Sequence, residues 1–250
     1  MLNLFSRIKD FIQNQVRNPI IIFLRILSLF KLVIRIKNIS LRNYKIDDLV
    51  DFTLLQKKKK ILNLQQTRSE IIQLLKMVKK SNPKYILEIG TLDGGTLFLF
   101  SRIARNDALL LSIDLPKGKI GGPGSKWRVY SDWRIHIIKQ FSHVNQRLEL
   151  IRADSHDNTT LHRIKQILKG KKLDFIFIDA DHSFNGVKKD FEMYSPLLKK
   201  GGLIAFHDIV PTPHGENVYK FWETIKKNFD FEEIIEDRNQ KAGGIGILKK

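Results

Sequence analysis

The 250-residue chain contains no cysteine. It therefore forms no disulfides, and it offers no thiolate zinc site, no cysteine-ligated iron–sulfur cluster and no cysteine nucleophile. Hydrophobic residues make up 42% of the chain, which is enough to bury the core of one moderately large α/β domain with an appendage.

A long uninterrupted apolar run is also missing. Residues 19–36 are very apolar, but Arg25, Lys31 and Arg35 break the stretch, so we expect no transmembrane helix. No small-residue cleavage site follows an unbroken apolar core, so we expect no secretory signal either. The sequence instead predicts one or two basic amphipathic helices within residues 1–40. These helices either lie on an anionic membrane surface or pack against the main domain or a second subunit.

Acidic residues are scarce in the N-terminal third of the chain. The formal net charge is +18, and residues 1–80 hold 17 Lys and Arg against five Asp and Glu. A basic arm of this kind can meet anionic lipid, nucleic acid or a phosphorylated substrate. The alternative is compositional, because only six alanines accompany abundant Lys, Ile and Asn, and many lysines would then be solvated surface. We expect a cytoplasmic protein, peripheral to the membrane if the arm binds lipid.

The rest of the chain alternates apolar strands with amphipathic helices, which predicts a seven-stranded, mostly parallel sheet covered on both faces. We expect residues 65–250 to form this domain and residues 1–64 to form a basic helical extension and connector. Thr67 and Glu70 have capping-box spacing and mark the first domain helix. No helix separates the final two strands, so the last one is expected to be antiparallel. The expected strands are 85–89, 108–113, 148–152, 174–178, 202–206, 231–236 and 244–248, and the later helices are 94–105, 131–141, 158–168, 187–198 and 216–228.

The turn after the first strand is rich in glycine. Residues 88–96 read EIGTLDGGT, and an apolar helical pattern follows them. Glycines at a strand-to-helix turn let the backbone approach a ligand closely and leave the first helix amides free for an anionic group. Position 92 is Leu where the nicotinamide fingerprint needs glycine, so a pyrophosphate is disfavoured. Glu88 before the turn suits a ligand that carries cationic groups.

Acids follow the next strands along the chain. Asp114 lies 24 residues beyond Gly90, close to the spacing at which an acid accepts hydrogen bonds from ribose hydroxyls. Asp154 follows the third strand and can accept from an adenine amino group. Asp179 ends the fourth strand, and Asp208 comes just after the fifth. Each acid alone would be a solvated strand-end residue or a helix cap, but in a parallel sheet all of them reach one edge.

Four motifs carry a resemblance to a known family: EIGTLDGGT at 88–96, ADSHD at 153–157, FIDADH at 177–182 and GGLIAFHD at 201–208. With them, residues 65–250 resemble the class I S-adenosylmethionine-dependent methyltransferases. Within that class the chain looks most like the bacterial small-molecule and sugar O-methyltransferases grouped with the cephalosporin-biosynthesis and macrolide-sugar enzymes. The resemblance implies a Rossmann-like fold, S-adenosylmethionine as methyl donor and, in many relatives, a divalent cation such as Mg²⁺.

The resemblance also implies a set of site residues. His182 matches the base of the macrolide-sugar enzymes and Asp181 that of another sugar-methylating branch, and a neutral imidazole is the better base near neutral pH. The alternative for either residue is a cap on the following helix. Asp179, His207 and Asp208 are the expected metal ligands, although many relatives have two consecutive acidic groups at the last two positions, and histidine suits Mg²⁺ poorly. The residues expected to bind the donor are Glu88, Gly90, Thr91, Gly94, Asp114, Asp154, Ser155 and Asp179.

The expected function is methyl transfer to a hydroxyl of a sugar, glycan or related small metabolite, by a monomer or a homo-oligomer. One alternative is a nucleic-acid (RNA) methyltransferase that uses the basic arm. No Asn-Pro-Pro-Tyr or Asp-Pro-Pro-Tyr segment follows the fourth strand, and the absence of cysteine disfavours methylation of pyrimidine carbon 5, so we expect no nucleic-acid partner. The other alternative is a non-catalytic membrane- or partner-binding module that keeps the fold.

One glycine-rich stretch interrupts the alternation. Residues 116–127 hold four glycines within seven residues, directly after the second strand. We expect either a mobile flap that closes over donor and acceptor or a tolerated surface insertion. Trp127 and Trp133 can stack on the adenine or the acceptor, although core packing is the simpler interpretation. His156 and His214 are expected to form local hydrogen bonds.

Overall fold

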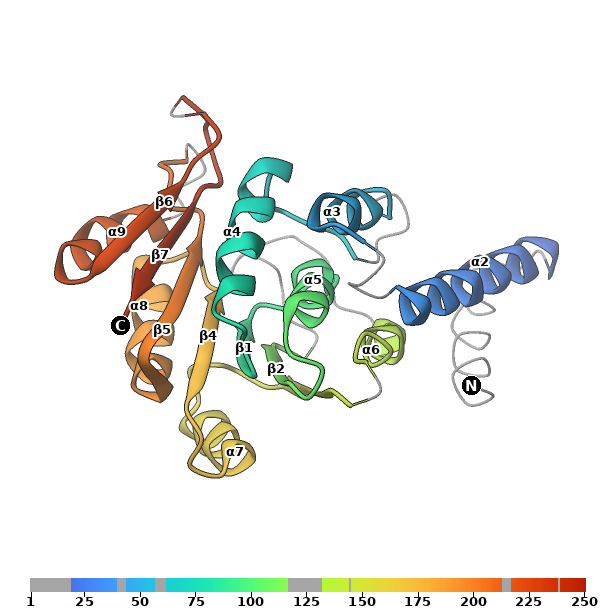
Figure 1. Cartoon of the computed structure of the whole chain (residues 1–250), viewed down its shortest axis with the longest axis horizontal. Helices are drawn as coiled ribbons and strands as arrows, with labels where there is room; N and C mark the ends of the chain where they lie inside the picture. The colour runs from blue at the N-terminus through green and yellow to red at the C-terminus, as the bar shows by residue number, and fades with distance from the viewer. Residues whose placement is uncertain are drawn as a thin grey trace.

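Seven strands form the centre of the molecule. The computed structural model describes residues 19–39, 44–56, 62–116, 132–143, 145–212, 217–237 and 239–250. Its strands are β1 (Tyr85–Ile89), β2 (Leu109–Asp114), β3 (Arg147–Arg152), β4 (Leu173–Ile178), β5 (Leu198–His207), β6 (Asp230–Ile234) and β7 (Ile245–Lys249). They lie in the order β3-β2-β1-β4-β5-β7-β6 (Figure 1). Strands β1 to β5 pair in parallel and β7 pairs antiparallel with both β5 and β6, which confirms the predicted sheet.

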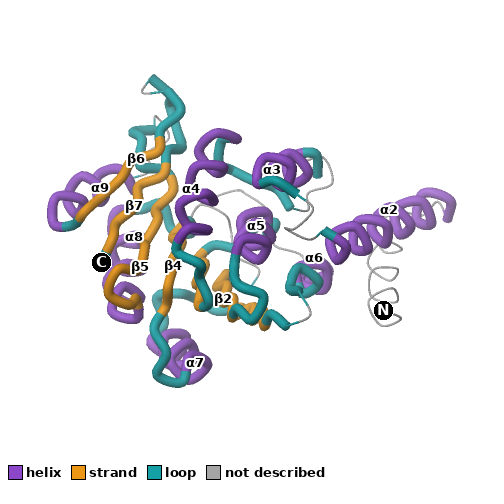
Figure 2. Tube along the Cα trace, in the orientation of Figure 1, coloured by secondary structure: helices purple, strands orange, loops and turns teal. Residues whose placement is uncertain are grey.

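Helices pack on both faces of this sheet (Figures 1 and 2). One buried apolar cluster joins the sheet to α2 (Pro19–Asn38), α3 (Ile46–Leu54), α4 (Arg68–Lys80), α5 (Gly95–Ile103) and α6 (Asp132–Ile138). A second cluster joins it to α7 (Asn158–Leu168), α8 (Phe184–Tyr194) and α9 (Val218–Ile225). The three layers form the predicted Rossmann-like α/β fold. Among the described helices, none combines the length and the apolar character needed to cross a bilayer.

The central strands are apolar along their length because both of their faces are covered. Strand β4, LDFIFI, is buried at every position. Its alternate residues point to opposite faces, so Phe175 and Phe177 join the first cluster and Ile176 and Ile178 join the second. On the first face the ring of Phe100 in α5 packs edge-on against both phenylalanines, with centroids 5.1 and 5.4 Å away.

The capping box before α4 is confirmed. Thr67 Oγ1 accepts a hydrogen bond from Glu70 N at 3.3 Å, and Glu70 Oε2 accepts one from Thr67 N at 3.3 Å. Other predicted helix ends were wrong by a few residues. Helix α8 begins at Phe184 rather than 187, because Ser183 caps it by accepting from Gly186 N. It ends at Tyr194, where a 3₁₀ turn with a proline at its second position follows, so β5 starts four residues earlier than expected.

The extension and connector predicted over residues 1–64 contain the helices α2 and α3. The C-terminal half of α2 packs on the same apolar cluster through Leu32, Val33 and Ile36, which are buried. The boundary between extension and domain at residue 64 stays a prediction. Several expectations lie outside the described residues: the first 18 residues of the segment expected to be helical, most of the glycine-rich stretch with Trp127, the side chain of Trp133, and His214.

Candidate functional site

Gly90 fixes how closely the ends of β1 and β4 approach each other. Its φ is +99°, and a Cβ at this position would lie 1.9 Å from the carbonyl oxygen of Asp179. Its amide donates to Ile113 O at 2.9 Å, while Asp179 N donates to Ile89 O at 2.8 Å. Only glycine fits this position, so the turn after β1 and the acid after β4 form one rigid unit.

The glycine turn also forms the start of α5. Gly94 is the N-cap with φ +78°, and its amide donates to Thr91 O at 2.7 Å. The Thr91 hydroxyl lies 2.5 Å from the Ser112 hydroxyl of β2. With glycine as the cap, the N-terminus of α5 has no side-chain cap hydrogen bond within the described part of the chain. That end of the helix is therefore suited to an anionic group such as the carboxylate of an amino acid.

Glu88 is fully buried beneath this turn. Its two carboxyl oxygens accept hydrogen bonds from Thr96 Oγ1 at 2.6 Å and from Ser112 Oγ at 2.7 Å. Burial raises the pKa of the carboxyl to about 8, although the two hydroxyls lower it in part. Both oxygens of Glu88 are therefore engaged within the protein, and its contact with a cationic ligand stays a prediction.

The acids of β2 and β3 lie at the same edge of the sheet. Asp114 pairs with Arg152 in the β2–β3 register, and its Oδ2 accepts from Leu92 N in the glycine turn at 2.9 Å. Burial raises the pKa of Asp114, against the lowering effect of that hydrogen bond. Asp154, two residues beyond β3, is exposed and accepts from His156 N at 2.8 Å. The neighbouring Ser155 carbonyl accepts from Tyr194 Oη at 2.7 Å.

Two carboxylates and two imidazoles meet at the ends of β4 and β5. His182 Nδ1 lies 3.2 Å from Asp208 Oδ2, and His182 Nε2 lies 3.5 Å from Asp179 Oδ1. His207 Nδ1 lies 3.3 Å from an oxygen of each of the same two acids. Ligand atoms of Asp179, His182 and Asp208 all fall within 4.8 Å of one another, so this group has the spacing of a metal site.

The charges within this cluster stabilise one another. Burial opposes the charged forms, but His207 and His182 hold the pKa of Asp179 well below its ordinary value. Likewise, burial opposes protonation of His207, yet Asp179 and Asp208 raise the pKa of its imidazole well above the ordinary value. His207 Nε2 is buried and has no hydrogen-bond partner among the described residues. The donor set of imidazole nitrogens and carboxylate oxygens suits Mn²⁺, Fe²⁺ or Zn²⁺ better than Mg²⁺.

The backbone holds Asp208 and Asp181 in different roles. Asp208 has φ +63°, and its Oδ1 accepts from Gly243 N at 3.1 Å, which fixes the carboxylate beside His182. Asp181 Oδ1 instead accepts from Ser183 N at 2.8 Å, next to the start of α8. Asp181 therefore stabilises the turn before α8 and does not cap the helix, because the cap is Ser183. Its role as a base stays a prediction.

Sequence reasoning missed one residue of the cluster. Gln66, in the connector before α4, is buried and donates from Nε2 to Asp179 Oδ2 at 2.9 Å. Its Oε1 has no hydrogen-bond partner in the described part of the chain. The two residues are 113 positions apart, and no spacing rule connects a polar residue before one helix with the end of a distant strand. Burial of a glutamine is the structural signal that identifies it.

Comparison with known families gives one match in this region. Residues 87–209 match the family model described as a methyltransferase domain. The matched range begins in β1 and ends just after Asp208. It therefore contains the glycine turn and all the residues of the carboxylate–imidazole cluster other than Gln66.

Two proteins of similar sequence are described as uncharacterized. One, from Sinorhizobium fredii, is 24% identical over 152 residues, which is 60% of this chain and 16% of that protein. The other, from Acanthamoeba polyphaga mimivirus, is 28% identical over 130 residues, which is 52% of this chain and 53% of that protein. The matched part thus spans about a sixth of the first relative and about half of the second.

Solved structures share the fold at low sequence identity. An O-methyltransferase from Bacillus cereus in complex with SAH has a TM-score of 0.56 at 19% identity, covering 81% of this chain and 90% of that one. An O-methyltransferase from Streptomyces achromogenes, involved in tomaymycin synthesis and in complex with SAM, has a TM-score of 0.55 at 13% identity, covering 81% and 89%. At these identities the likeness establishes the fold.

Proposed function

Residues 87–209 of this chain match a methyltransferase domain. On that premise we propose that the protein transfers a methyl group from S-adenosylmethionine to a hydroxyl oxygen of a sugar, glycan or related small metabolite. The single observation that carries the proposal is the position of His182. Its imidazole lies between Asp179 and Asp208 at the edge of the sheet where the glycine turn also ends. A base is thus available next to the expected donor site.

The residues of the glycine turn and the neighbouring strand ends are suited to hold the donor. The N-terminus of α5, which begins at a glycine cap without a side-chain hydrogen bond, suits the carboxylate of its methionine part. Asp114 and Asp154 suit its ribose hydroxyls and adenine amino group. The solved O-methyltransferases of similar fold from B. cereus and S. achromogenes, which contain SAH and SAM, support the choice of donor.

When bound, S-adenosylmethionine supplies an electrophilic methyl carbon on a sulfonium. The acceptor hydroxyl must lose its proton as its oxygen attacks, and His182 takes that proton. Asp208 lies beside Nδ1 and orients the ring, and it is itself fixed by the amide of Gly243. Holding the acceptor oxygen in line with the methyl carbon supplies much of the remaining acceleration.

A divalent cation fits the same cluster. Asp179 and Asp208 would hold it with oxygen, and His182 or His207 with nitrogen, in a partly buried site. Such an ion lowers the pKa of an acceptor hydroxyl. His207, with its raised pKa, already places one positive charge between the two acids.

Incubation of host extract with labelled S-adenosylmethionine tests the proposal. Wild-type protein should yield a labelled small molecule, and mass spectrometry then identifies the methylated atom. His182→Ala should lower the yield about 100-fold or more, because general bases contribute on that order, while donor affinity is kept. His162→Ala, an exposed histidine on α7, is the matched control and should behave as wild type. Undiminished turnover in His182→Ala would remove the residue from this role.

A further inference from the structure

Helix α2 is apolar on two faces, and only one of them is covered by the described residues of the chain. Leu32, Val33 and Ile36 are buried in the first apolar cluster. A second set of apolar side chains lies exposed, with relative accessibilities of 37% to 68%. We call this set the α2 stripe: Ile20, Phe23, Leu27 and Ile34.

The spacing of the stripe puts its members on one side of the helix. Successive members are three, four and seven residues apart, which is the repeat of one helical face. In a globular protein such a face is normally buried against another element. Four exposed apolar residues in register therefore indicate a surface that has a partner elsewhere.

The charge of α2 has one sign. Its 20 residues include Arg25, Lys31, Arg35 and Lys37 and no Asp or Glu. Neither Lys31 nor Arg35 pairs with a carboxylate among the described residues, although the Arg35 guanidinium lies 4.9 Å from the ring of Phe52. Lys31 and Arg35 thus border the stripe without a counter-charge in the described part of the chain. A partner with negative charge and an apolar interior complements both features.

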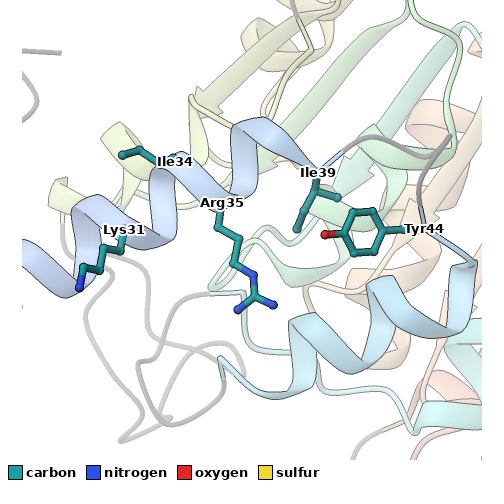
Figure 3. A pocket seen from close by; sticks show the side chains of 5 residues that line it. All are labelled: Lys31, Ile34, Arg35, Ile39 and Tyr44. Carbon is teal, nitrogen blue, oxygen red and sulfur yellow. The ribbon is translucent and has the colours of Figure 1, made fainter.

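A hollow beside the stripe combines the same two chemistries (Figure 3). It has a volume of about 290 Å³ and lies between α2 and the segment that leads into α3. Two cations and a phenol hydroxyl open onto it beside two apolar side chains. Its lining residues are Lys31, Ile34, Arg35, Ile39 and Tyr44. Such a site suits the phosphate of a lipid headgroup with part of an acyl chain against the isoleucines.

The orientation of α2 leaves its stripe accessible. The N-terminal half of the helix extends away from the sheet and from the other described helices (Figures 1 and 2). A helix of this length is about 30 Å long, so its outer half can lie on a flat surface without obstruction from the domain. Helix α2 is not long and apolar enough to cross a bilayer.

We propose that α2 docks in the plane of an anionic phospholipid bilayer, with the α2 stripe inserted among the acyl chains and Lys31 and Arg35 on lipid phosphates. Charge favours lipid over a second copy of this chain. Two α2 helices meeting through their stripes would bring cations of like sign together with no acid on either helix to pair them. The inference is independent of the methyl-transfer reaction.

Sedimentation of the full chain with vesicles tests the proposal. The protein should pellet with vesicles of phosphatidylglycerol and stay in the supernatant with vesicles of phosphatidylcholine. Added NaCl should release it, because the attraction between exposed charges is screened. Lys31→Glu with Arg35→Glu should weaken the partition into phosphatidylglycerol vesicles about fivefold or more for each cation removed. Phe23→Ser with Leu27→Ser should weaken it independently of salt.

Matched controls separate docking from folding. Lys79→Glu with Lys80→Glu changes the net charge equally at the end of α4, and Phe231→Ser removes an exposed phenylalanine from β6. Both controls should pellet as wild type. Circular dichroism melting should be the same for the α2 variants and wild type, because the altered side chains are exposed.

Three results would overturn the proposal. The first is a wild-type chain that stays in the supernatant with phosphatidylglycerol. The second is pelleting of the α2 variants equal to that of wild type. The third is a dimer in sedimentation velocity that Phe23→Ser with Leu27→Ser converts to a monomer, since a second copy would then cover the stripe.

Discussion

Gln66 donates a hydrogen bond from Nε2 to Asp179 Oδ2 at 2.9 Å. This contact ties the connector before α4 to the acid at the end of β4. It leaves Asp179 Oδ1 directed at His182 and His207, 3.5 and 3.3 Å away. The connector is further anchored at the glycine turn, where Leu62 N donates to Asp93 O at 3.0 Å. Gln66 therefore acts as a positioning residue for the carboxylate–imidazole cluster.

We predict that Gln66→Ala lowers kcat about tenfold or more, because a hydrogen bond to a charged acceptor contributes roughly 1.5–3 kcal/mol. The KM for the donor should change little, since Gln66 contacts the acid rather than the glycine turn. Gln73→Ala is the control, because that side chain bonds to a backbone carbonyl on the exposed face of α4. Equal kcat in wild type and Gln66→Ala would show that Asp179 needs no support from the connector.

Gly90→Ala is predicted to destabilise the fold and abolish donor binding. The added Cβ would lie 1.9 Å from Asp179 O, so β1 and β4 must separate. Gly170→Ala isolates the contribution of backbone strain, since Gly170 has φ +78° but open space around it. The Gly170→Ala control should lower the free energy of unfolding, measured in urea, by about 1–2 kcal/mol. Gly90→Ala should lower it clearly more. Similar unfolding free energies for the two variants would contradict the predicted clash.

Glu88 should make folding stability depend on pH. Its pKa is about 8 in the folded protein and 4.5 in an unperturbed side chain, so the folded state keeps a proton that the unfolded state has lost. The contribution of this proton to the free energy of unfolding is fully present below pH 4.5, and it falls by about 1.4 kcal/mol per pH unit as the pH rises toward 8. Glu88→Gln should remove this part of the slope in urea unfolding of the ligand-free protein.

Glu232→Gln, at an exposed site on β6, is the control for that measurement and should keep the wild-type slope. If Glu88→Gln also keeps the wild-type dependence of unfolding free energy on pH, the Glu88 carboxyl is ionised in the folded protein. The expected role of Glu88 beside a cationic ligand would then gain support.

Removal of metal tests the second proposed role of the cluster. Dialysis against EDTA should lower turnover, and Mn²⁺ should restore it better than Mg²⁺ because of the imidazole ligands. Elemental analysis of purified protein should find a divalent ion that Asp208→Asn loses and Asp230→Asn, on exposed β6, retains. Full turnover after EDTA, with no bound ion at the start, would mean that protonated His207 supplies the positive charge of the cluster.

The sequence was sufficient to predict the sheet because its strands are buried on both faces. Continuous apolar segments such as LDFIFI, separated by amphipathic helices, have few alternatives to a parallel sheet. The exchange of positions that puts β7 between β5 and β6 was not predicted in detail, since strand order depends on long-range packing. The start of α8 was missed because Ser183 was not recognised as its cap.

The strand-end acids were identified for the same topological reason. Strand ends in a parallel sheet share an edge, so Asp179 and Asp208 could be expected to meet. Gln66 could not be found in this way, because its contact depends on the path of the connector across the glycine turn. The environment of helix α2 could not be predicted from the sequence either, because its composition is compatible with packing on the domain and with exposure. The burial of individual side chains in the structure distinguishes its two faces.

Calorimetric titration of the purified chain with S-adenosylmethionine tests the central claim most directly. We predict saturable heat at one site, a rise in melting temperature with donor concentration, and loss of affinity in Asp114→Asn. Absence of both heat and thermal stabilisation in a folded wild-type sample would contradict the account.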